Sequence, residues 1–415
     1  MKKVIVFSFI IALLASIFLI VFLTGNNEKS HQSDSMENLK ALPYLTWVPA
    51  GKDIQKSGVI RYDHRRAYSG INLFNSRNLS RAYLMDMQGR ILHTWEAKIN
   101  EDDSWQHVEL CEKGDLLAIV KDRMLVRLDW NSNIRWYQHL RLHHDVAVAE
   151  NGDIYTLVRE EESFSVSGYS IPILNEYVVV LSSEGEIKKK VSLFDIFKEE
   201  IRPGKFVEIR RWMNDSRNLK ELERRRENND FQFTSREPQN VIHINTVEIL
   251  DRNIDKIGRK GNLLVCALKL DLVGIIDLEN QKLVWKWGPG NLSQPHHPTF
   301  LENGHILIFD NGVERRYSRV VELDPSRKKI VWEYQSDPPQ QFYSVSRGSS
   351  QRLPNGNTLI TDSDKGYVFE ATFGGEIVWE FFNPEIRIED DKRAAIYRMT
   401  RIIDFKKYPF LESLE

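Results

Sequence analysis

Two pairs of adjacent histidines stand at matching places in two stretches of the chain. In the first stretch His144 lies eight residues before Gly152, and in the second His296 lies eight residues before Gly304. Each glycine follows an asparagine and separates two apolar runs, a pattern typical of a β-hairpin with a tight turn. The repeat therefore predicts a strand–turn–strand scaffold that carries an imidazole at the same position twice.

A third histidine joins this group of candidates. His243 and Asn245 begin another apolar strand, and regular two-residue alternation places both side chains on one face of it. The remaining candidates flank these residues: His143, His297 and Asn311. A single histidine on a strand is usually structural, but histidines at comparable places in three strands favour a shared site.

Clustered imidazoles support two kinds of chemistry. A neutral imidazole is a nucleophile near neutral pH and can also transfer protons. Three imidazoles can instead bind a transition metal and leave one coordination position open. Histidine ligands usually have a carboxylate nearby to orient them, and here only Asp145 adjoins a candidate histidine. We therefore expect a site that works without a metal.

A repeat of short strands must position these residues. Half of the unit is a strand, a glycine turn and a strand, with turns at Gly114, Gly152, Gly261, Gly304 and Gly356. The other half ends in a strand with a tryptophan: Trp95, Trp136, Trp285, Trp332 and Trp379. Four such antiparallel strands make one propeller blade, and the innermost strands line a channel on which repeated polar positions converge. We predict an all-β fold, a six-bladed β-propeller over residues 42–415, in which segments 70–96 and 394–405 share the blade that closes the ring.

One segment breaks the repeat. Residues 194–237 are rich in charged helix formers, which predicts a helical insertion between two blades. A solvated decoration is the favoured interpretation, and a lid over the channel mouth is the alternative.

The N-terminus has a different composition. Lys2 and Lys3 precede an uncharged stretch over residues 4–23, which is long enough to span a bilayer as a helix. The positive-inside rule then sends the rest of the chain out of the cytoplasm. We expect a transmembrane signal-anchor over residues 1–23, a polar linker over 24–41 and a periplasmic or otherwise extracytoplasmic propeller. Cleavage of the segment as a signal peptide is the alternative.

Composition limits the partners. The 415 residues carry a net charge of -2, which gives no indication of nucleic acid as a partner. The only cysteines, Cys111 and Cys266, lie in apolar runs, so buried free thiols are favoured over one long-range disulfide. The sequence has no Gly-x-x-x-x-Gly-Lys-Ser/Thr loop that would cradle the phosphates of a nucleotide.

Several motifs occur together in a fixed order. They include MDMQGRILHTW at 85–95, HHDV at 143–146, HINTVE at 243–248, WKWGPG at 285–290, HHPT at 296–299, FDNG at 309–312 and QRLPNGNTLI at 351–360. Between about residues 57 and 400 the chain resembles the bacterial-type arylsulfotransferase family, whose enzymes do not use a phosphoadenosine-linked donor.

The resemblance implies a six-bladed propeller that moves a sulfuryl group from an aryl sulfate donor to a phenol acceptor, through a sulfohistidine and without a cofactor. By position, His296 matches the nucleophile and His144 an accessory histidine, with His143 the other possibility. His243 and Asn245 match the family's His-x-Asn pair. Substrate contacts are expected from His143, His297, Lys269 and Asn311.

Two residues depart from the family pattern. Leu268 stands where the family usually has an arginine, and Pro295 stands where it tends to have a glutamine. By strand alternation Lys269 faces away from the channel, and only a local bulge would turn it inward. We expect the outward placement and hence a slow enzyme.

Two other functions stay open. A propeller of the same descent could bind a ligand or partner without turnover, because a fold does not fix a function. A quinone-cofactor dehydrogenase is a remote third, since it would need paired neighbouring cysteines, and the chain has none.

Overall fold

The glycine turns connect short antiparallel strands in the structure, a computed structural model that describes residues 46–100, 103–166, 168–227 and 238–414. Gly304 shows how one turn forms. Its φ is 83°, and its amide donates a hydrogen bond to the Leu301 carbonyl over 2.9 Å. Because a Cβ is disfavoured at this φ, glycine stabilises the reversal between the two strands.

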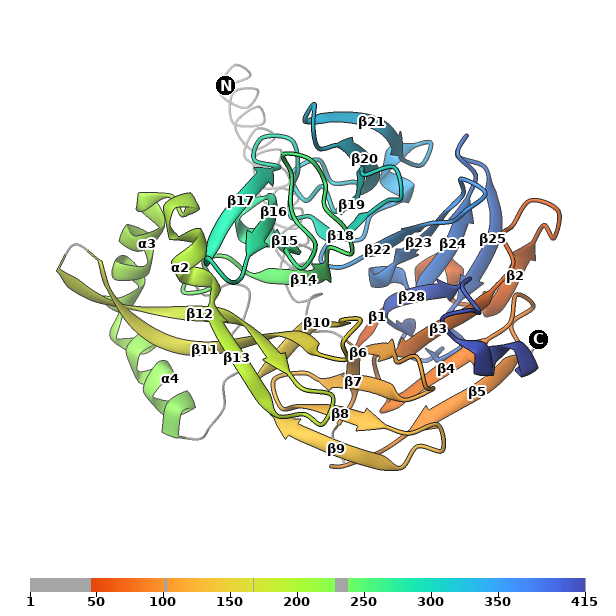
Figure 1. The fold of residues 1–415 in the computed structure, drawn as a ribbon, viewed down its shortest axis with the longest axis horizontal. Coiled ribbons are helices and arrows are strands. Elements are labelled where there is room, and N and C mark those ends of the chain that lie inside the picture. The colour runs from red at the N-terminus through yellow and green to blue at the C-terminus, as the bar shows by residue number, and fades with distance from the viewer. Residues whose placement is uncertain (1–45, 101–102, 167, 228–237, 415) are drawn as a thin grey trace, which may run out of the picture. The chain divides into compact units, whose positions relative to one another are not determined.

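Six antiparallel sheets of four or five strands make up most of the described chain (Figure 1). Three of them are β6–β9 (Trp105–Leu110, Leu116–Val120, Met124–Leu128, Ile134–His139), β10–β13 (Leu142–Val148, Ile154–Val166, Tyr169–Leu181, Ile187–Ser192) and β14–β17 (Ile244–Ile249, Leu263–Ala267, Leu272–Asp277, Lys282–Trp287). The others are β18–β21 (His296–Phe300, Ile306–Asp310, Arg319–Asp324, Lys329–Tyr334), β22–β25 with β2 (Ser349–Arg352, Thr358–Asp362, Tyr367–Ala371, Ile377–Phe382, Gly58–Tyr62), and β28 with β3–β5 (Ile396–Ile402, Ile71–Ser76, Arg81–Met85, Ile91–Glu96).

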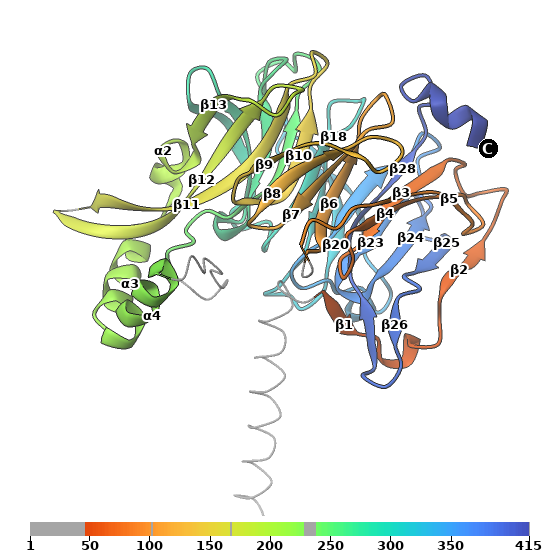
Figure 2. The same ribbon diagram turned by 90° about the horizontal axis from the view of Figure 1, so that it is seen from below.

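The first strands of these sheets form a closed ring. β6 contacts β10, and the contacts continue through β14, β18, β22 and β28 back to β6. Figures 1 and 2 show the sheets arranged around this ring, with their other strands further out. The fold is therefore all-β and propeller-like, as the sequence predicts, and inner strands from distant parts of the chain meet near one axis.

Both ends of the described chain contribute to closing the ring. β28 pairs with β3, so the first and last repeat segments share a sheet, as predicted. A second small sheet joins β1 (Trp47–Pro49), β27 (Lys392–Ala394) and β26 (Ile386–Arg387). On β28 the buried Arg401 donates to Asn72 Oδ1 of β3 over 3.0 Å and forms an ion pair with Glu370 of β24. One guanidinium thus connects the closing sheet to the sheet before it.

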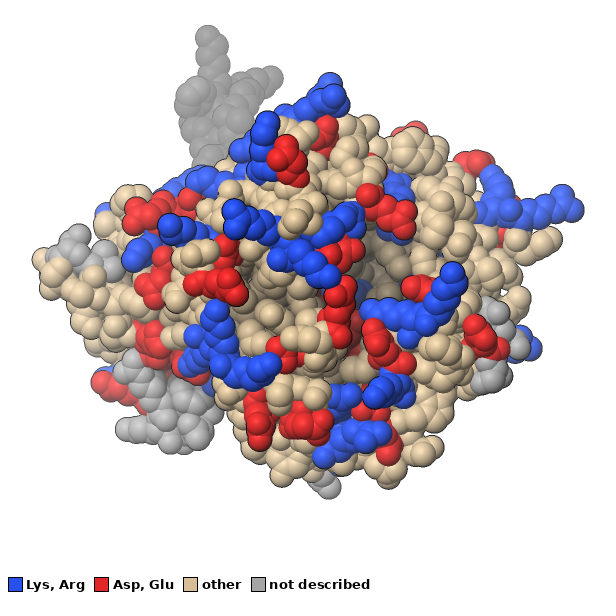
Figure 3. Space-filling model, in the orientation of Figure 1, with Lys and Arg blue, Asp and Glu red and all other residues tan. Residues whose placement is uncertain are grey.

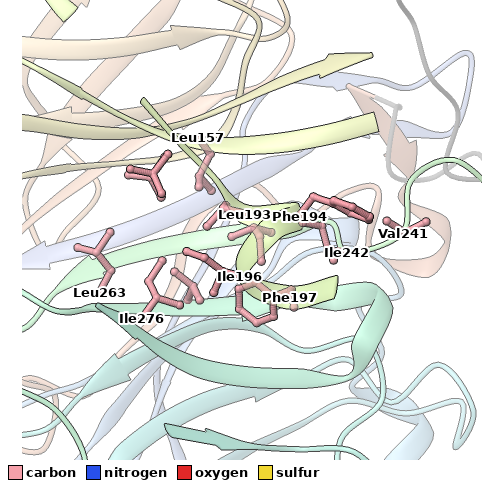
Figure 4. Close-up of a cluster of buried hydrophobic side chains, with 14 of the residues drawn as sticks. Leu157, Leu193, Phe194, Ile196, Phe197, Val241, Ile242, Leu263 and Ile276 are labelled. Carbon is pink, nitrogen blue, oxygen red and sulfur yellow. The ribbon is translucent and has the colours of Figure 1, made fainter. Parts of the chain in front are cut away.

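The insertion after β13 is helical, and part of it is buried. It contains α2 (Leu193–Phe197), α3 (Pro203–Met213) and α4 (Ser216–Glu227), while the predicted remainder, 228–237, lies outside the described residues. Ser192 caps α2 by accepting a hydrogen bond from the Asp195 amide over 3.2 Å. Phe194 and Phe197 pack in one core cluster with Leu157 of β11 (Figure 4). α3 and α4 lie outside the ring, beside the long β11–β12 hairpin, as Figure 2 shows.

Two further predictions concern the cysteines and the N-terminus. Cys111 and Cys266 are buried free thiols, as expected. No helix in the described part of the chain is long and apolar enough to cross a membrane. The predicted anchor (1–23) and linker (24–41) lie outside the described residues.

The buried Arg401 ion pair yields a stability prediction. Arg401→Met leaves the Glu370 carboxylate buried without its partner, and breaking such a pair costs about 3–5 kcal/mol. We expect denaturant unfolding to show a loss of that size. Arg61→Met is the matched control, since Arg61 joins β2 to β25 through an ion pair with Glu380 but is 57% exposed, which makes a loss of under about 1 kcal/mol the expectation. Equal losses in the two variants would contradict this account of ring closure.

Candidate functional site

Histidines from three sheets meet where the inner strands converge. His144 lies on β10, His296 begins β18, and His243 directly precedes β14. Nε2 of His144 is 2.9 Å from Nε2 of His243, and the ring centroids of His144 and His296 are 6.5 Å apart. The structure thus brings together the three imidazoles that the repeat singled out.

The amide of Asn311 sets the tautomer of His296. Asn311 Nδ2 donates to the carbonyls of Ser344 and Arg347 over 2.7 and 2.8 Å, which uses both of its hydrogens and fixes the orientation of the amide. The amide oxygen therefore faces Nδ1 of His296 over 2.7 Å, and this nitrogen must carry the proton. Nε2 of His296 is left with a lone pair, and it has no hydrogen-bond partner among the described residues.

Burial keeps the His296 imidazole neutral. The side chain is almost fully buried, and this burial lowers its pKa to about 4, although the hydrogen bond to Asn311 opposes the shift. Burial likewise lowers the pKa of His144 and of His243, with a smaller contribution from nearby positive groups. At neutral pH the cluster therefore offers uncharged nitrogen lone pairs.

A second chain of hydrogen bonds runs through the accessory histidines. Asn240 Nδ2 lies 2.7 Å from Nδ1 of His243, and the Tyr397 hydroxyl lies 3.0 Å from Nδ1 of His144. Since His243 and His144 bond each other through Nε2, they share one proton that can move to or from a neighbouring group. Neither Asn240 nor Tyr397 is predicted from the sequence, because neither stands at a repeated distance from a glycine turn.

The backbone is strained at the histidine cluster. His144, His243 and His297 have φ values of 64°, 52° and 45°, which are uncommon for residues with a Cβ and concentrate at functional sites. The pairing of β10 shifts register around His144 and that of β18 around His297, and the pairing of β14 shifts just after His243, between Ile244 and Val247. The predicted regular alternation between His243 and Asn245 is therefore wrong, because the register of β14 shifts after Ile244 and His243 precedes the strand in a left-handed conformation.

The other predicted residues surround the cluster in supporting positions. Asn245 Nδ2 donates over 2.9 Å to the carbonyl of Pro295, next to the His296 backbone. His297 Nδ1 accepts a hydrogen bond from the Ser350 amide over 3.3 Å. His143 is fully buried with Nε2 3.5 Å from the carboxylate of Glu176. Asn245 therefore positions the strand that carries His296.

The strand assignment made for Leu268 and Lys269 is wrong. β15 ends at Ala267, and Leu268–Leu270 form a short 3₁₀ turn, so strand alternation does not apply to them. Lys269 is close to the insertion: burial lowers its pKa, and repulsion from Lys205 of α3 lowers it further. The Lys269 charge also contributes to the lowered pKa of His243, after the larger effect of burial.

The state of His296 is open to direct measurement. In a ¹⁵N NMR titration we expect the Nδ1–H tautomer at neutral pH and protonation of Nε2 only as the pH falls through about 4. Asn311→Leu removes the acceptor that selects this tautomer, so a mixture of tautomers is expected in that variant. An Nε2–H tautomer in the wild-type protein, or a pKa near 6.5, would contradict the assigned geometry.

Solved structures resemble this fold at low sequence identity. A protein of unknown function from Bacteroides caccae matches with a TM-score of 0.50 and 12% identity over 81% of this chain and 100% of that one. A virginiamycin B lyase from Staphylococcus aureus has a TM-score of 0.44 and 11% identity, with 83% and 98% covered. A β-propeller domain of Cps50 (Swd1) from Myceliophteria thermophila has a TM-score of 0.40 and 10% identity, with 81% and 98% covered.

Sequence comparison identifies the protein family of this chain. No curated protein matches the chain. The sequence profile of the arylsulfotransferase (ASST) family matches residues 113–384, which include the three clustered histidines and Asn311. This match covers more than half of the chain and agrees with the motifs read from the sequence, so the chain belongs to the arylsulfotransferase family.

Proposed function

We propose that the protein transfers a sulfuryl group from an aryl sulfate to a phenol in two displacements at His296, within a ring of six blades. The observation that carries the proposal is that Nε2 of His296 has no hydrogen-bond partner among the described residues. Asn311 holds the proton on Nδ1 and so leaves the lone pair on Nε2. Nε2 attacks sulfur, a nitrogen–sulfur bond forms, and the sulfur–oxygen bond to the phenol breaks. The acceptor oxygen then attacks sulfur, and the nitrogen–sulfur bond returns its electrons to Nε2.

Each neighbour of His296 has a role in this scheme. Sulfation at Nε2 makes the ring cationic, and the Asn311 oxygen stabilises that charge through the Nδ1–H bond. The His144–His243 pair can donate its shared proton to the departing phenolate and can later accept the proton of the incoming phenol. Asn245 holds the Pro295 carbonyl and hence the start of β18.

We also propose that this reaction takes place outside the cytoplasm. The uncharged stretch over residues 4–23 supports an N-terminal anchor that would tether the described domain through a polar linker.

A second candidate is a family member that binds aryl anions without turnover. The observation that favours it is Leu268, a buried apolar residue where the family usually has an arginine. Because an arginine beside a sulfuryl group balances charge in the transition state, its loss could leave binding without catalysis.

A burst experiment tests the covalent intermediate. With 4-nitrophenyl sulfate and no acceptor, the protein should release about one equivalent of phenol per site, since the sulfuryl group stays on His296. Mass spectrometry of the quenched protein should find acid-labile sulfation on the peptide that contains His296. His296→Ala should show neither signal, and a full burst from that variant would refute the assignment. Binding of the ester without any burst would favour the second candidate.

Chelation tests the competing metal chemistry. A histidine nucleophile needs no metal, so exhaustive treatment with a chelator should leave the burst unchanged, whereas a histidine-bound metal would be lost with its activity. Activity that disappears on chelation and returns only with an added divalent ion would overturn the nucleophile mechanism.

A further inference from the structure

Glu176 is a buried acid to which the proposed sulfuryl transfer gives no role. Figure 3 shows acidic and basic side chains on the surface, around a hollow near the centre of that face. Glu176 lies on β12 instead, and it is 0% exposed. Because a carboxyl group is rarely buried to this extent without polar partners, its surroundings indicate what it does.

One oxygen of Glu176 holds the backbone next to His243. Oε2 accepts a hydrogen bond from the Ile244 amide over 2.5 Å. Ile244 begins β14 and directly follows His243, whose φ of 52° is uncommon for a residue with a Cβ. Such a conformation persists only where its surroundings fix it. Glu176 therefore supports the backbone that presents His243 to His144.

The other oxygen of Glu176 faces His143. Oε1 lies 3.5 Å from Nε2 of His143, slightly farther than in an ordinary hydrogen bond, and neither atom has a hydrogen-bond partner among the described residues. The His143 ring centroid is 5.0 Å from that of His144 and 6.1 Å from that of His243. Glu176 and His143 thus form a buried dyad that packs against the two histidines that share a proton.

Charged and titratable groups from several strands surround this dyad. Arg159 of β11 is the register partner of Glu176, and it forms an ion pair with Asp122 over 2.7 and 2.5 Å. The other groups that affect His143 come from the segments before β10 and β14 and after β7: Arg141, His243 and Lys121. Positive groups therefore predominate around the imidazole.

The proton between the two facing atoms belongs to Glu176. Burial raises the pKa of Glu176 to about 8, although the Ile244 amide and the Arg159 charge oppose the shift. Burial also lowers the pKa of His143 well below its usual range, and the surrounding positive groups lower it further. A buried ion pair would in addition require the desolvation of both charges. At neutral pH the dyad is therefore a carboxylic acid beside a neutral imidazole.

We propose that Glu176 is a positioning residue that holds the accessory histidines while it is a neutral acid. The effect of Glu176 on the rate rests on the proposed sulfuryl transfer. Protonated Oε1 donates to Nε2 of His143, and Oε2 accepts the Ile244 amide. Ionisation removes the donor and places a negative charge against the imidazole. The orientation of His143, and with it the packing behind His144, then changes.

The pH dependence of the burst with 4-nitrophenyl sulfate tests this role. The wild-type burst rate should fall as the pH rises through about 8, where Glu176 ionises. Glu176→Gln keeps a neutral side chain with one donor and one acceptor in place, so it should react at close to the wild-type rate at neutral pH and should not show this fall. Lys121 also titrates nearby, with a pKa lowered to about 7 by burial. A fall near pH 8 that persists in Glu176→Gln would therefore contradict the proposal.

Two further variants separate the contacts of Glu176 from its charge. Glu176→Ala removes both contacts and should slow the burst by up to about 100-fold, because the histidines are then misplaced. Glu160→Gln is the matched control: Glu160 lies on the adjacent strand β11 and pairs with Lys190, but its side chain is 40% exposed, and its pH profile should match that of the wild type. Loss of the burst in Glu176→Gln at neutral pH would show that Glu176 acts as a base or as a charge, and would overturn the proposal.

Infrared difference spectroscopy reports the protonation state of Glu176 without turnover. At neutral pH the wild-type protein should show the carbonyl stretching band of a protonated carboxyl group that Glu176→Gln lacks. The comparison with this variant is needed because burial raises the pKa of Glu248 to about 8 as well. Identical spectra of the two proteins in this region would refute the neutral acid. If the band is present but no aryl sulfate gives a burst, the proposed transfer fails while the neutral dyad is confirmed.

Discussion

The amide of Asn311 is the contact on which the chemistry of the site depends. Two backbone carbonyls, from Ser344 and Arg347, hold its nitrogen, and its oxygen in turn holds Nδ1–H of His296. The carbonyls belong to the segment before β22, whereas His296 begins β18. The lone pair on Nε2 of His296 is therefore set by the docking of one sheet against the next.

Closure of the ring supplies the rigidity that this arrangement needs. The inner strands contact one another in sequence from β6 to β28, and β28 returns to β3 through pairing and through the buried Arg401. Three histidines in this ring have positive φ, a conformation that persists only where the surrounding structure over-determines it. The register shifts in β10, β14 and β18 lie at or next to these histidines, so regular strand alternation does not set their side-chain directions.

Sequence patterns identified the repeated strands, the shared closing sheet and the three histidines, because strand alternation and glycine turns are local properties of the chain. They failed at Leu268–Leu270, where a 3₁₀ turn replaces the expected strand, and at His243, where a register shift breaks alternation. Asn240 was missed because it lies in an irregular segment three residues before His243, where no strand pattern applies. Tyr397 was missed because only the packing of distant sheets brings it to His144.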